Sequence, residues 1–415
     1  MSKRRVVITG LGAIDAIGKN VEETWQSLLA GNCGIDKITK IDNIEQFSSQ
    51  IAAEVKDYDP NDYFDRKKIK KMDLYTQFAL IAAQEAMEDS GLLTAEFDHD
   101  RAGVLIATGI GGMLTFEQEA QKLAAKGPRR ISPMFIPKMI SNIGSAEVAI
   151  KYNLRGINFN IASACASANH ALGTALRTIQ YGDADLILAG GAEASVTPLA
   201  VAGFASMKAL STRNDDPKTS SRPFDKERDG FVIGEGGAVL VLEELEHAKK
   251  RGAKILAEVV GYGATCDAYH ITAPAPDGEG GARAIAIALK DAGLQPEDID
   301  YINAHGTSTP LNDKNETTAF KTVFQEHAQK LKISSTKSMT GHTLGAAAAL
   351  EAIACVKSIL TGKIHGTMNL INPDPECDLD YIPNKAIDYE VNIALSNSLG
   401  FGGHNGVIIF KKYQD

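Results

Sequence analysis

Short apolar runs rich in β-branched residues alternate along the chain with longer segments that have helical apolar spacing. The runs are RRVVITGLG, RAGVLIATG, ADLILAGGAEA and GGAVLVLEE in the first part, then KILAEVVGYG, DIDYINAHG, LKISSTKS and NGVIIF in the second. Segments such as TQFALIAAQEAMEDSGL and GGARAIAIALKDAGL separate them. Continuous apolar runs bounded by glycine are typical of strands covered on both faces. The pattern therefore predicts an α/β sandwich with buried, largely parallel strands.

The order of these pieces recurs along the chain. In the first part the turn SACAS leads into a small-residue helix, predicted from Ala168 to Ile179, that ends at YGDADLILAGG. In the second part the strand KISST and the turn KSMTGH lead into the helix LGAAAALEAIACVKSIL, and each series closes on a glycine-rich hairpin. We predict an internal duplication into halves 1–253 and 254–415. Because equivalent strand-to-helix turns would then meet at one central cleft, a composite site is expected there.

Composition and cysteine usage indicate an ordinary globular protein. With 415 residues, 44% of them hydrophobic, the chain can bury a full core without disulfides. Its cysteines show no CxxC or Cys/His spacing, which argues against a disulfide framework or a zinc site. They are Cys33, Cys165, Cys266, Cys355 and Cys377. This usage fits a reducing compartment, so we expect a cytoplasmic protein.

Net charge and hydropathy argue against a nucleic-acid-binding protein and against a membrane protein. A net charge of −9 disfavours nucleic-acid binding, which depends on attraction to the phosphate backbone. The N-terminal sequence MSKRRVVITGLGAI is broken by glycine and has a β-rich pattern instead of a signal-peptide core. We find no run of about 18 or more apolar residues, so no membrane span is expected.

Two basic segments stand out against the acidic total. The first, DRKKIKKMD, holds Arg66, Lys67, Lys68, Lys70 and Lys71, and the second, KGPRRISP, holds Arg129 and Arg130. Such a run is consistent with a solvated helix face. It is equally consistent with a docking patch for an acidic partner.

Cys165 is the first candidate for chemistry. It stands between an apolar strand and the helix predicted from Ala168. A helix dipole and free backbone N–H groups at such a position stabilise a thiolate, the reactive form of cysteine. The small neighbours Ala164, Ala166 and Ser167 leave room for a substrate. A cysteine among alanines is also consistent with an inert, small hydrophobic residue.

Two histidines occupy comparable junctions. His305 lies in YINAHGTSTP at a strand end, and His342 lies in SSTKSMTGHTLGAAAAL, shortly after Lys337 and beside a helix start. A protease-type pair would need Cys165, one histidine and an Asn or Asp to orient it. The second histidine and the lysine instead fit a site where neutral imidazole N–H groups stabilise charge on a bound carbonyl or enolate.

The glycine-rich segment SNSLGFGGHNG, Ser396 to Gly406, is the last candidate. No phosphate-binding helix pattern follows it, so a nucleotide site is rejected. Its glycines suit a tight backbone excursion that lines the cleft, or a plain hairpin turn.

Together these motifs resemble the β-ketoacyl-acyl-carrier-protein synthases over essentially the whole chain. The matching motifs are VVITGLG, SACAS, GDADLILAGGAEA, LSTRND, RPFDKERDGFVIGEG, NAHGTSTPLND, SSTKSMTGHTLGAA and GFGGHNG, in the family's order. The chain is most similar to the elongating type, since the initiating type replaces the second histidine with asparagine. The resemblance implies the thiolase fold, with duplicated halves in a five-layered αβαβα sandwich, and a homodimer.

The resemblance also implies roles for the candidate residues. Cys165 would accept the acyl chain as a thioester, and the N–H groups of Cys165 and Phe401 would form the oxyanion hole. His305 and His342 would hold the malonyl thioester carbonyl and promote decarboxylation, supported by Lys337. The resulting enolate would attack the acyl-Cys165 thioester and give a 3-oxoacyl product. Phe401 also resembles a gate residue for the acyl chain.

Other positions match family residues that bind or support. Asp313 and Glu316 match acidic positions that organise the histidine network, and Thr307 and Thr309 match threonines that contact the phosphopantetheine arm. Ile110 matches a residue bordering the acyl pocket. The positions that match carrier-protein contacts are Lys67, Lys70, Lys71, Arg129, Arg130 and Lys208. Phosphopantetheine would arrive on the acyl carrier protein, so no resident cofactor or metal is expected.

Some features depart from the family pattern or leave alternatives open. Asp15 and Ala16 stand where Ser-Pro is usual, and the nucleophile motif reads CASA. A thiolase would need a second catalytic cysteine, but Cys355 lies within a predicted helix and Cys377 in an irregular stretch. A non-catalytic chain-length factor would lack Cys165. A polyketide-type condensing subunit that acts with a partner chain stays open.

Overall fold

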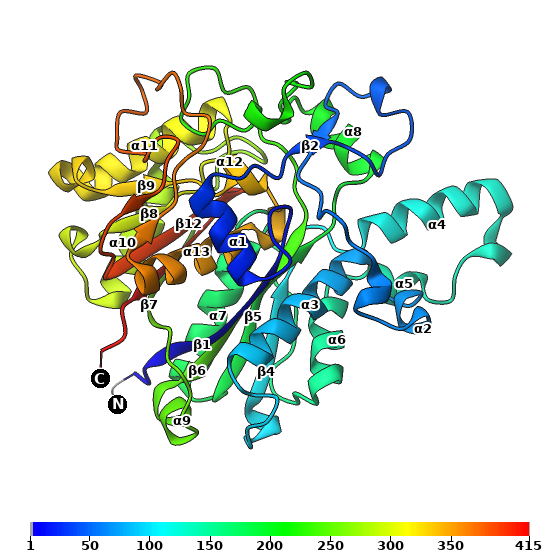
Figure 1. The fold of residues 1–415 in the computed structure, drawn as a ribbon, viewed down its shortest axis with the longest axis horizontal. Helices are drawn as coiled ribbons and strands as arrows, with labels where there is room; N and C mark the ends of the chain where they lie inside the picture. The colour runs from blue at the N-terminus through cyan, green and yellow to red at the C-terminus, as the bar shows by residue number, and fades with distance from the viewer. Residues whose placement is uncertain (1–2, 415) are drawn as a thin grey trace.

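The computed structural model describes residues 3–414 and places a mixed sheet through the centre of the molecule (Figure 1). Within these residues the sheet has nine strands. In their order across the sheet they are β4 (Ala102–Ala107), β5 (Leu186–Glu193), β6 (Gly236–Glu244), β1 (Val6–Ile14), β7 (Ala257–Cys266), β13 (His404–Lys411), β12 (Ile393–Gly400), β8 (Tyr301–Asn303) and β9 (Lys332–Ser334).

The prediction of largely parallel strands was wrong. Only β4/β5, β12/β8 and β8/β9 run parallel, and the other neighbours among the described strands run antiparallel. The reason lies in the connections: β12 turns directly into β13 through a glycine-rich hairpin, and a tight hairpin can join only antiparallel strands.

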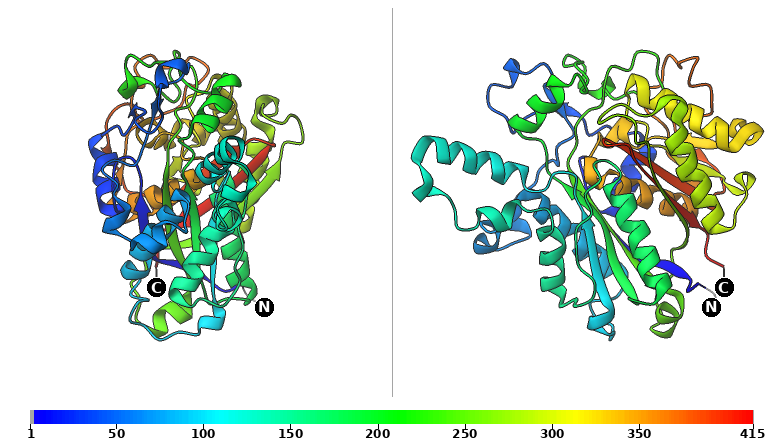
Figure 2. Two further views of the ribbon diagram at one scale, coloured as in Figure 1. Left: turned by 90° about the vertical axis from the view of Figure 1, so that its right-hand side faces the viewer. Right: turned by 180° about the vertical axis from the view of Figure 1, so that it is seen from behind.

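Helices cover the sheet so that the molecule has five layers. The outer helices α3 (Leu74–Asp89) and α6 (Ile143–Tyr152) pack on the first half, and α10 (Glu279–Ala292) and α11 (Pro310–Phe324) on the second. Two small-residue helices, α7 (Ser167–Tyr181) and α13 (Ala347–Thr361), lie between the two halves of the sheet (Figure 2). The predicted αβαβα layering is thus present.

The sheet is continuous only at one end of its central strands. β1 pairs with β7 over Val6–Ile8, and beyond that point the two strands separate. Two backbone N–H groups of β1 that no longer face β7 bind to side chains of α3. Glu85 accepts a hydrogen bond from the N–H of Ala13, and Asp89 accepts one from the N–H of Leu11. The separation creates the space that α7 and α13 fill.

The two halves repeat one another in connectivity. In the first, α7 leads to β5 and then β6; in the second, α13 leads to β12 and then β13. Between them, α9 (Leu245–Lys250) ends the first series and β7 begins the second. The boundary near residue 253 falls in this connection and stays a prediction.

The remaining elements decorate this frame. The helices are α1 (Val21–Ala30), α2 (Arg66–Ile69), α4 (Met113–Lys126), α5 (Phe135–Met139), α8 (Pro198–Ser206) and α12 (Lys337–Thr340), and the short strands are β2 (Asp36–Lys37), β3 (Ile51–Ala52), β10 (Lys363–Ile364) and β11 (Ile387–Asp388). The α4 helix projects from the body of the first half (Figure 1).

One apolar stretch was overlooked in the sequence. The 18 residues Leu344–Thr361 have a mean hydropathy of 1.6, enough in length and composition for a membrane span. In the structure 83% of this stretch is buried, because it contains α13 at the centre of the sandwich. A helix buried on all sides by protein is apolar all round for the same reason as a membrane helix.

Candidate active site

A cavity of about 530 Å³ opens where the two halves meet. Both halves line it, and the lining includes eight of the predicted site residues: Ile110, Cys165 and Lys208 from the first half, and His305, Thr307, Thr309, His342 and Phe401 from the second. The composite site expected from the repeat is therefore present as a cavity. Lys337, Asp313 and Glu316 lie outside its lining.

Cys165 sits in a strained turn just before α7. The preceding Ala164 has a left-handed φ of 51°, which is uncommon for a residue other than glycine. Ser167 holds the turn: its hydroxyl donates to the carbonyl of Ala164 at 2.6 Å and accepts from the N–H of Ser163 at 2.8 Å. The backbone of Gly400 passes so close that a Cβ there would lie 3.2 Å from the Cys165 nitrogen. The turn thus points the thiol into the cavity while the glycine-rich hairpin packs behind it.

Burial works against the thiolate that a helix start would favour at Cys165. Burial raises the pKa of the Cys165 thiol to about 12, and the nearby charge of Lys337 lowers it only in part. A thiol that is removed from water ionises with difficulty, even at a helix start. The thiolate expected from the helix start stays a prediction, and burial opposes it, so that a neighbour able to take the proton would favour attack by Cys165.

Two imidazoles face this thiol. The Cys165 sulfur and one nitrogen each of His305 and His342 lie within 4.8 Å of one another. The two rings are 5.3 Å apart and almost perpendicular. Burial lowers the pKa of both histidines well below the ordinary value, and the charge of Lys337 lowers it further. Both rings are neutral at neutral pH.

A backbone group fixes the tautomer of His342. The N–H of Leu344 donates to Nδ1 of His342 at 3.2 Å, so the ring proton must sit on Nε2. This Nε2 is buried without a hydrogen-bond partner, as is Nδ1 of His305. His342 therefore offers an N–H donor, whereas a nitrogen of His305 is free to accept. Although the trio has ligand types that suit zinc, a protonated Nε2 cannot coordinate a metal.

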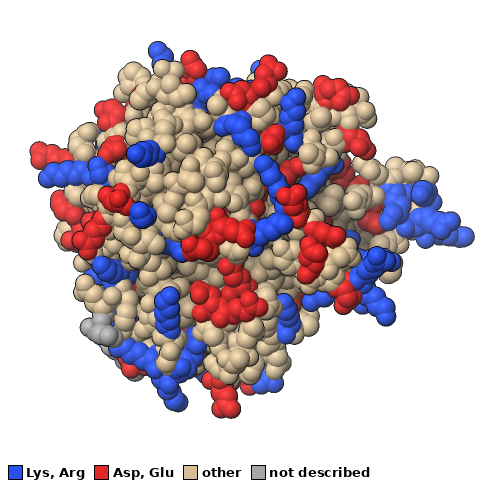
Figure 3. Space-filling model, viewed as in Figure 1, with Lys and Arg blue, Asp and Glu red and all other residues tan. Residues whose placement is uncertain are grey.

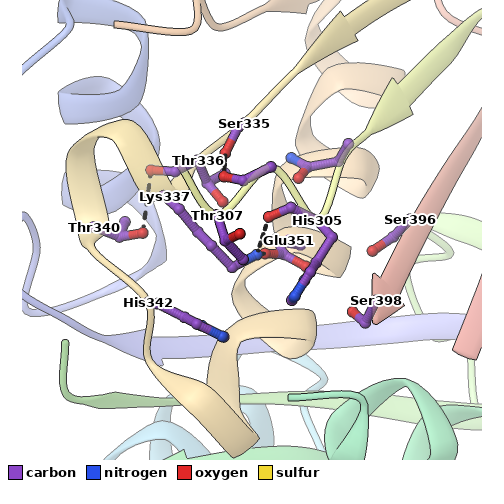
Figure 4. A network of polar contacts seen from close by, with 12 residues as sticks. His305, Thr307, Ser335, Thr336, Lys337, Thr340, His342, Glu351, Ser396 and Ser398 are labelled. Atoms are coloured by element: carbon purple, nitrogen blue, oxygen red, sulfur yellow. Dashed lines mark hydrogen bonds and ion pairs between the residues drawn. The ribbon is translucent and has the colours of Figure 1, made fainter. Parts of the chain in front are cut away.

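Behind the rings lies a buried ion pair. Lys337 donates from Nζ to the backbone carbonyl of His305 at 2.6 Å and forms an ion pair with Glu351 of α13. Figure 4 shows the Lys337 side chain reaching toward His305 and Glu351. The pair holds a positive charge next to the histidines without exposing it to water.

Carboxylates support the His305 turn from the outer side. Glu316 accepts hydrogen bonds from the N–H groups of His305 at 2.6 Å and Gly306 at 2.8 Å. Burial raises the pKa of Glu316 to about 7, and these N–H groups oppose the shift. Asp313 accepts from the N–H of Thr307 at 3.1 Å. Both acidic residues thus hold the backbone that carries His305.

The other cavity residues mark its walls and mouth. The hydroxyls of Thr307 and Thr309 lie 2.9 Å apart. Ile110 is 40% exposed, and Phe401 is half-buried in the hairpin between β12 and β13. Lys208 is exposed at the mouth.

The basic segments lie away from the cavity lining. Lys67 belongs to α2, and Lys70 and Lys71 follow it; Arg129 and Arg130 form a short turn after α4. All five side chains are exposed. Figure 3 shows Lys and Arg side chains gathered over α2 and the projecting end of α4.

Two buried carboxylates were missed in the sequence. Glu351 is the partner of Lys337. Glu193, at the end of β5, accepts hydrogen bonds from the N–H groups of Gly109 at 2.6 Å and Gly345 at 3.0 Å. It thereby ties the cavity wall of the first half to the turn before α13. The only sequence signal was a glutamate within an otherwise apolar run, such as LILAGGAEA or AALEAIA.

Known proteins of one family are similar to this chain over its full length. Residues 3–248 match the β-ketoacyl synthase N-terminal domain, and residues 256–371 match its C-terminal domain. The 3-oxoacyl-[acyl-carrier-protein] synthase 2 of Synechocystis sp. is 53% identical over 414 residues, covering 100% of this chain and 99% of the relative. The same-named protein of Staphylococcus aureus is 52% identical over 411 residues, covering 99% of each.

Solved structures agree with the sequence relatives. A chain from the complex of a type II polyketide synthase acyl-carrier protein with its ketosynthase superposes with a TM-score of 0.93 at 40% identity, covering 100% of both chains. A β-ketoacyl synthase from Burkholderia phymatum superposes with a TM-score of 0.92 at 36% identity, covering 99% of this chain and 100% of the other. The predicted thiolase fold is confirmed by these neighbours. The chain belongs to the β-ketoacyl synthase family.

Proposed function

We propose that this protein is a 3-oxoacyl-[acyl-carrier-protein] synthase that elongates acyl chains by decarboxylative condensation with malonyl-acyl-carrier protein. The observation that carries this proposal is the meeting of Cys165, His305 and His342 in one cavity between the halves. The 52–53% identity to full-length synthases of this name supports the same activity.

The first step transfers an acyl group to Cys165. As the sulfur attacks the thioester carbonyl of the acyl-carrier protein, its proton passes to His305, the ring with a nitrogen free to accept. The N–H groups of Cys165 and Phe401 stabilise the oxyanion. The carrier's thiol leaves with the proton from His305, so that both histidines are neutral again.

The second step makes the carbon nucleophile. The malonyl thioester oxygen accepts a hydrogen bond from Nε2–H of His342, beside neutral His305, and carbon dioxide leaves as negative charge develops on that oxygen. The enolate then attacks the acyl-Cys165 carbonyl. The product is a 3-oxoacyl chain two carbons longer, and the released thiolate of Cys165 regains a proton. Lys337 holds positive charge beside the developing enolate.

The cavity residues position the thioester. Thr307 and Thr309 offer paired hydroxyls to the phosphopantetheine arm at the mouth, and Ile110 borders the acyl chain. A bulkier residue at Ile110 should therefore shorten the longest chain that is extended. Because the arm arrives on the carrier protein, the protein needs no resident cofactor.

The basic surface around α2 and the end of α4 is proposed to receive the acidic carrier protein. Exposed lysines and arginines in this region supply the complementary charge: Lys67, Lys70, Lys71, Arg129, Arg130, with Lys208 at the cavity mouth. We further propose a homodimer that works in the cytoplasm, as the family resemblance implies.

A polyketide-type condensing subunit is the second candidate. It is favoured by the polyketide ketosynthase neighbour at 40% identity and by a chain of the ishigamide ketosynthase/chain length factor at 39% identity and a TM-score of 0.93. Such a subunit would need a second, different chain for activity. The higher identity to the fatty-acid-type synthases places it second.

The test is condensation by the purified chain alone. Carbon dioxide and 3-oxoacyl product are measured from malonyl-carrier protein with and without an acyl-carrier-protein primer. We expect primer-dependent product from the intact protein and none from Cys165→Ala. Activity that appears only with a partner chain would support the second candidate, and no condensation in either case would overturn both.

A further inference from the structure

The loop that carries the two threonine hydroxyls has no regular structure of its own. It comprises residues 306–309, here called the threonine loop, which lie between β8 and the start of α11 at Pro310. Ser308 at its centre has a left-handed φ of 67°. A residue other than glycine keeps such a conformation only where its surroundings impose it. The position of the hydroxyls therefore depends on contacts from outside the loop.

The contacts at Ser308 come from the other half of the molecule. The segment 222–230, in RPFDKERDG, belongs to the first half but lies against the threonine loop. The N–H of Arg222 donates to the Ser308 hydroxyl at 2.9 Å, and the N–H of Gly230 donates to the Ser308 carbonyl at 3.1 Å. Both polar groups of the strained residue are thus held by this segment.

Arg228 makes the largest set of these contacts. Its guanidinium donates to the carbonyl of Thr309 at 3.1 Å from Nε and to that of Pro310 at 2.9 Å from Nη2. Nη1 donates to the carbonyl of Asp225 at 2.9 Å and to the carboxylate of Asp374 at 2.6 Å. The side chain is 4% exposed, so these bonds form away from bulk water.

The charge of Arg228 is balanced on the loop's other side. Asp313 lies 3.6 Å from the Nε of Arg228 and accepts the N–H of Thr307. Arg228 therefore binds the backbone carbonyl of Thr309, and Asp313 binds the backbone N–H of Thr307. A planar guanidinium can hold several carbonyls at fixed angles, which a lysine ammonium cannot.

We propose that Arg228 is a positioning residue that sets the two threonine hydroxyls for the pantetheine arm across the boundary between the halves. The cavity lining includes Thr307 and Thr309 but not Arg228, so this residue acts through the loop. Its functional part rests on the proposed synthase activity. Its structural part, the fixing of the loop, does not.

The functional test compares two acyl donors in the intact protein and in Arg228→Lys. For an acyl-pantetheine thioester we expect kcat/KM of acyl transfer to fall about 10- to 100-fold, mainly through KM, because small misplacements of binding groups have effects of this size. For an S-acyl-mercaptoethanol thioester, which lacks the amides of the arm, the change should stay below about threefold. An equal loss on both donors would overturn the proposal.

Two further variants distinguish an effect on the threonine loop from a general folding defect. Arg213→Lys changes an arginine that donates to the same segment, at the carbonyl of Glu227, without touching the threonine loop, and should leave both donors unaffected. Asp374→Asn should reproduce the Arg228→Lys pattern more weakly.

Amide hydrogen exchange on the resting protein tests the structural part alone. Exchange at residues 306–309 should quicken in Arg228→Lys while the α7 amides stay unchanged. Unchanged exchange in the threonine loop would overturn the proposal. If the loop loosens but neither donor is used by the intact protein, the proposed synthase activity fails and the fixing of the loop by Arg228 stands.

Discussion

The turns before α7 and α13 have similar backbone geometry but carry different residues toward the cleft. Each has a non-glycine residue in the left-handed region, Ala164 with φ 51° and Leu344 with φ 48°, and each leads into a buried small-residue helix. The next residue is Cys165 in the first turn and Gly345 in the second. In the first turn this position points a sulfur into the cavity. In the second it carries no side chain.

The second turn has no room for a side chain at position 345, because neighbouring atoms lie too close to Gly345. A Cβ on Gly345 would collide with the backbone nitrogen of Gly109, and the N–H of Gly345 is bound by Glu193. The second turn instead contributes His342, just before the strained residue. The comparison teaches that two turns of similar geometry direct different residues toward the cleft, and that the candidate nucleophile lies where the two turns differ.

Making the first turn like the second should have the largest effect. In Cys165→Gly we expect acyl transfer and condensation to fall at least about 10³-fold, as loss of a nucleophile does in covalent catalysis. Decarboxylation of malonyl-carrier protein should continue, since His305 and His342 remain. Product analysis by mass spectrometry measures the loss. Cys355→Ser, a buried cysteine change within α13, is the control and should keep activity; condensation that survives Cys165→Gly would contradict the comparison.

The reverse change fills the second turn. Gly345→Ala should lower the free energy of unfolding by about 1–3 kcal/mol, because its Cβ meets backbone atoms that cannot move aside easily. Thermal unfolding measures this. Gly203→Ala in α8 is the matched control, since a Cβ there meets nothing within 4 Å. If Gly345→Ala were as stable as Gly203→Ala, the crowding described for the second turn would not exist.

The next prediction concerns the charge of Lys337 beside the two histidines of the second half. Lys337 lowers the pKa of both His305 and His342, so its replacement should raise their pKa toward the ordinary value. In Lys337→Met/Glu351→Gln, which removes both members of the pair, protonation at about pH 6 should reduce decarboxylation by up to about fourfold per histidine relative to about pH 8, the limit reached if the pKa returns to about 6.5. The intact protein should show no such fall.

The control for this pH profile is Lys332→Met, which removes a partly exposed lysine of the second half. Its profile should follow that of the intact protein. A double variant with the same flat profile would show that Lys337 does not keep the imidazoles neutral.

The smallest expected effect concerns the proposed docking surface for the carrier protein around α2. Reversing Lys67 and Lys71 to glutamate should raise KM for carrier-protein substrates several-fold at low salt, and less at high salt, because exposed charges are screened. KM for acyl-pantetheine should not change. Lys330→Glu, an exposed change before β9, is the control; an unchanged KM in the double reversal would remove the docking role.

Much of the fold could be predicted because its signals are local. Apolar runs and glycine-rich turns marked the strands, the recurrence of small-residue helices predicted two similar halves, and the five layers were implied by the family resemblance. The antiparallel share of the sheet was missed because short apolar runs do not show strand direction. The apolar character of Leu344–Thr361 was overlooked, although it marks the buried centre of the sandwich.

Some residues of the candidate site had a local sequence signal and others did not. Cys165, His305 and His342 could be found because each stands at a junction with a turn signal. Glu193 and Glu351 could not, because their partners are far away in sequence and only packing brings them together. The raised pKa of the Cys165 thiol could not be predicted, because its main cause is burial, which a sequence does not show.

The most direct test of the division of labour between the turns is the mass of the protein after incubation with an acyl-carrier protein alone. Both the intact protein and His342→Ala should gain one acyl group per chain, mapped by peptide analysis to Cys165. On addition of malonyl-carrier protein, only the intact protein should lose that group rapidly as 3-oxoacyl product. An acyl group on any other residue, or a His342→Ala protein that condenses at the intact rate, would contradict the account.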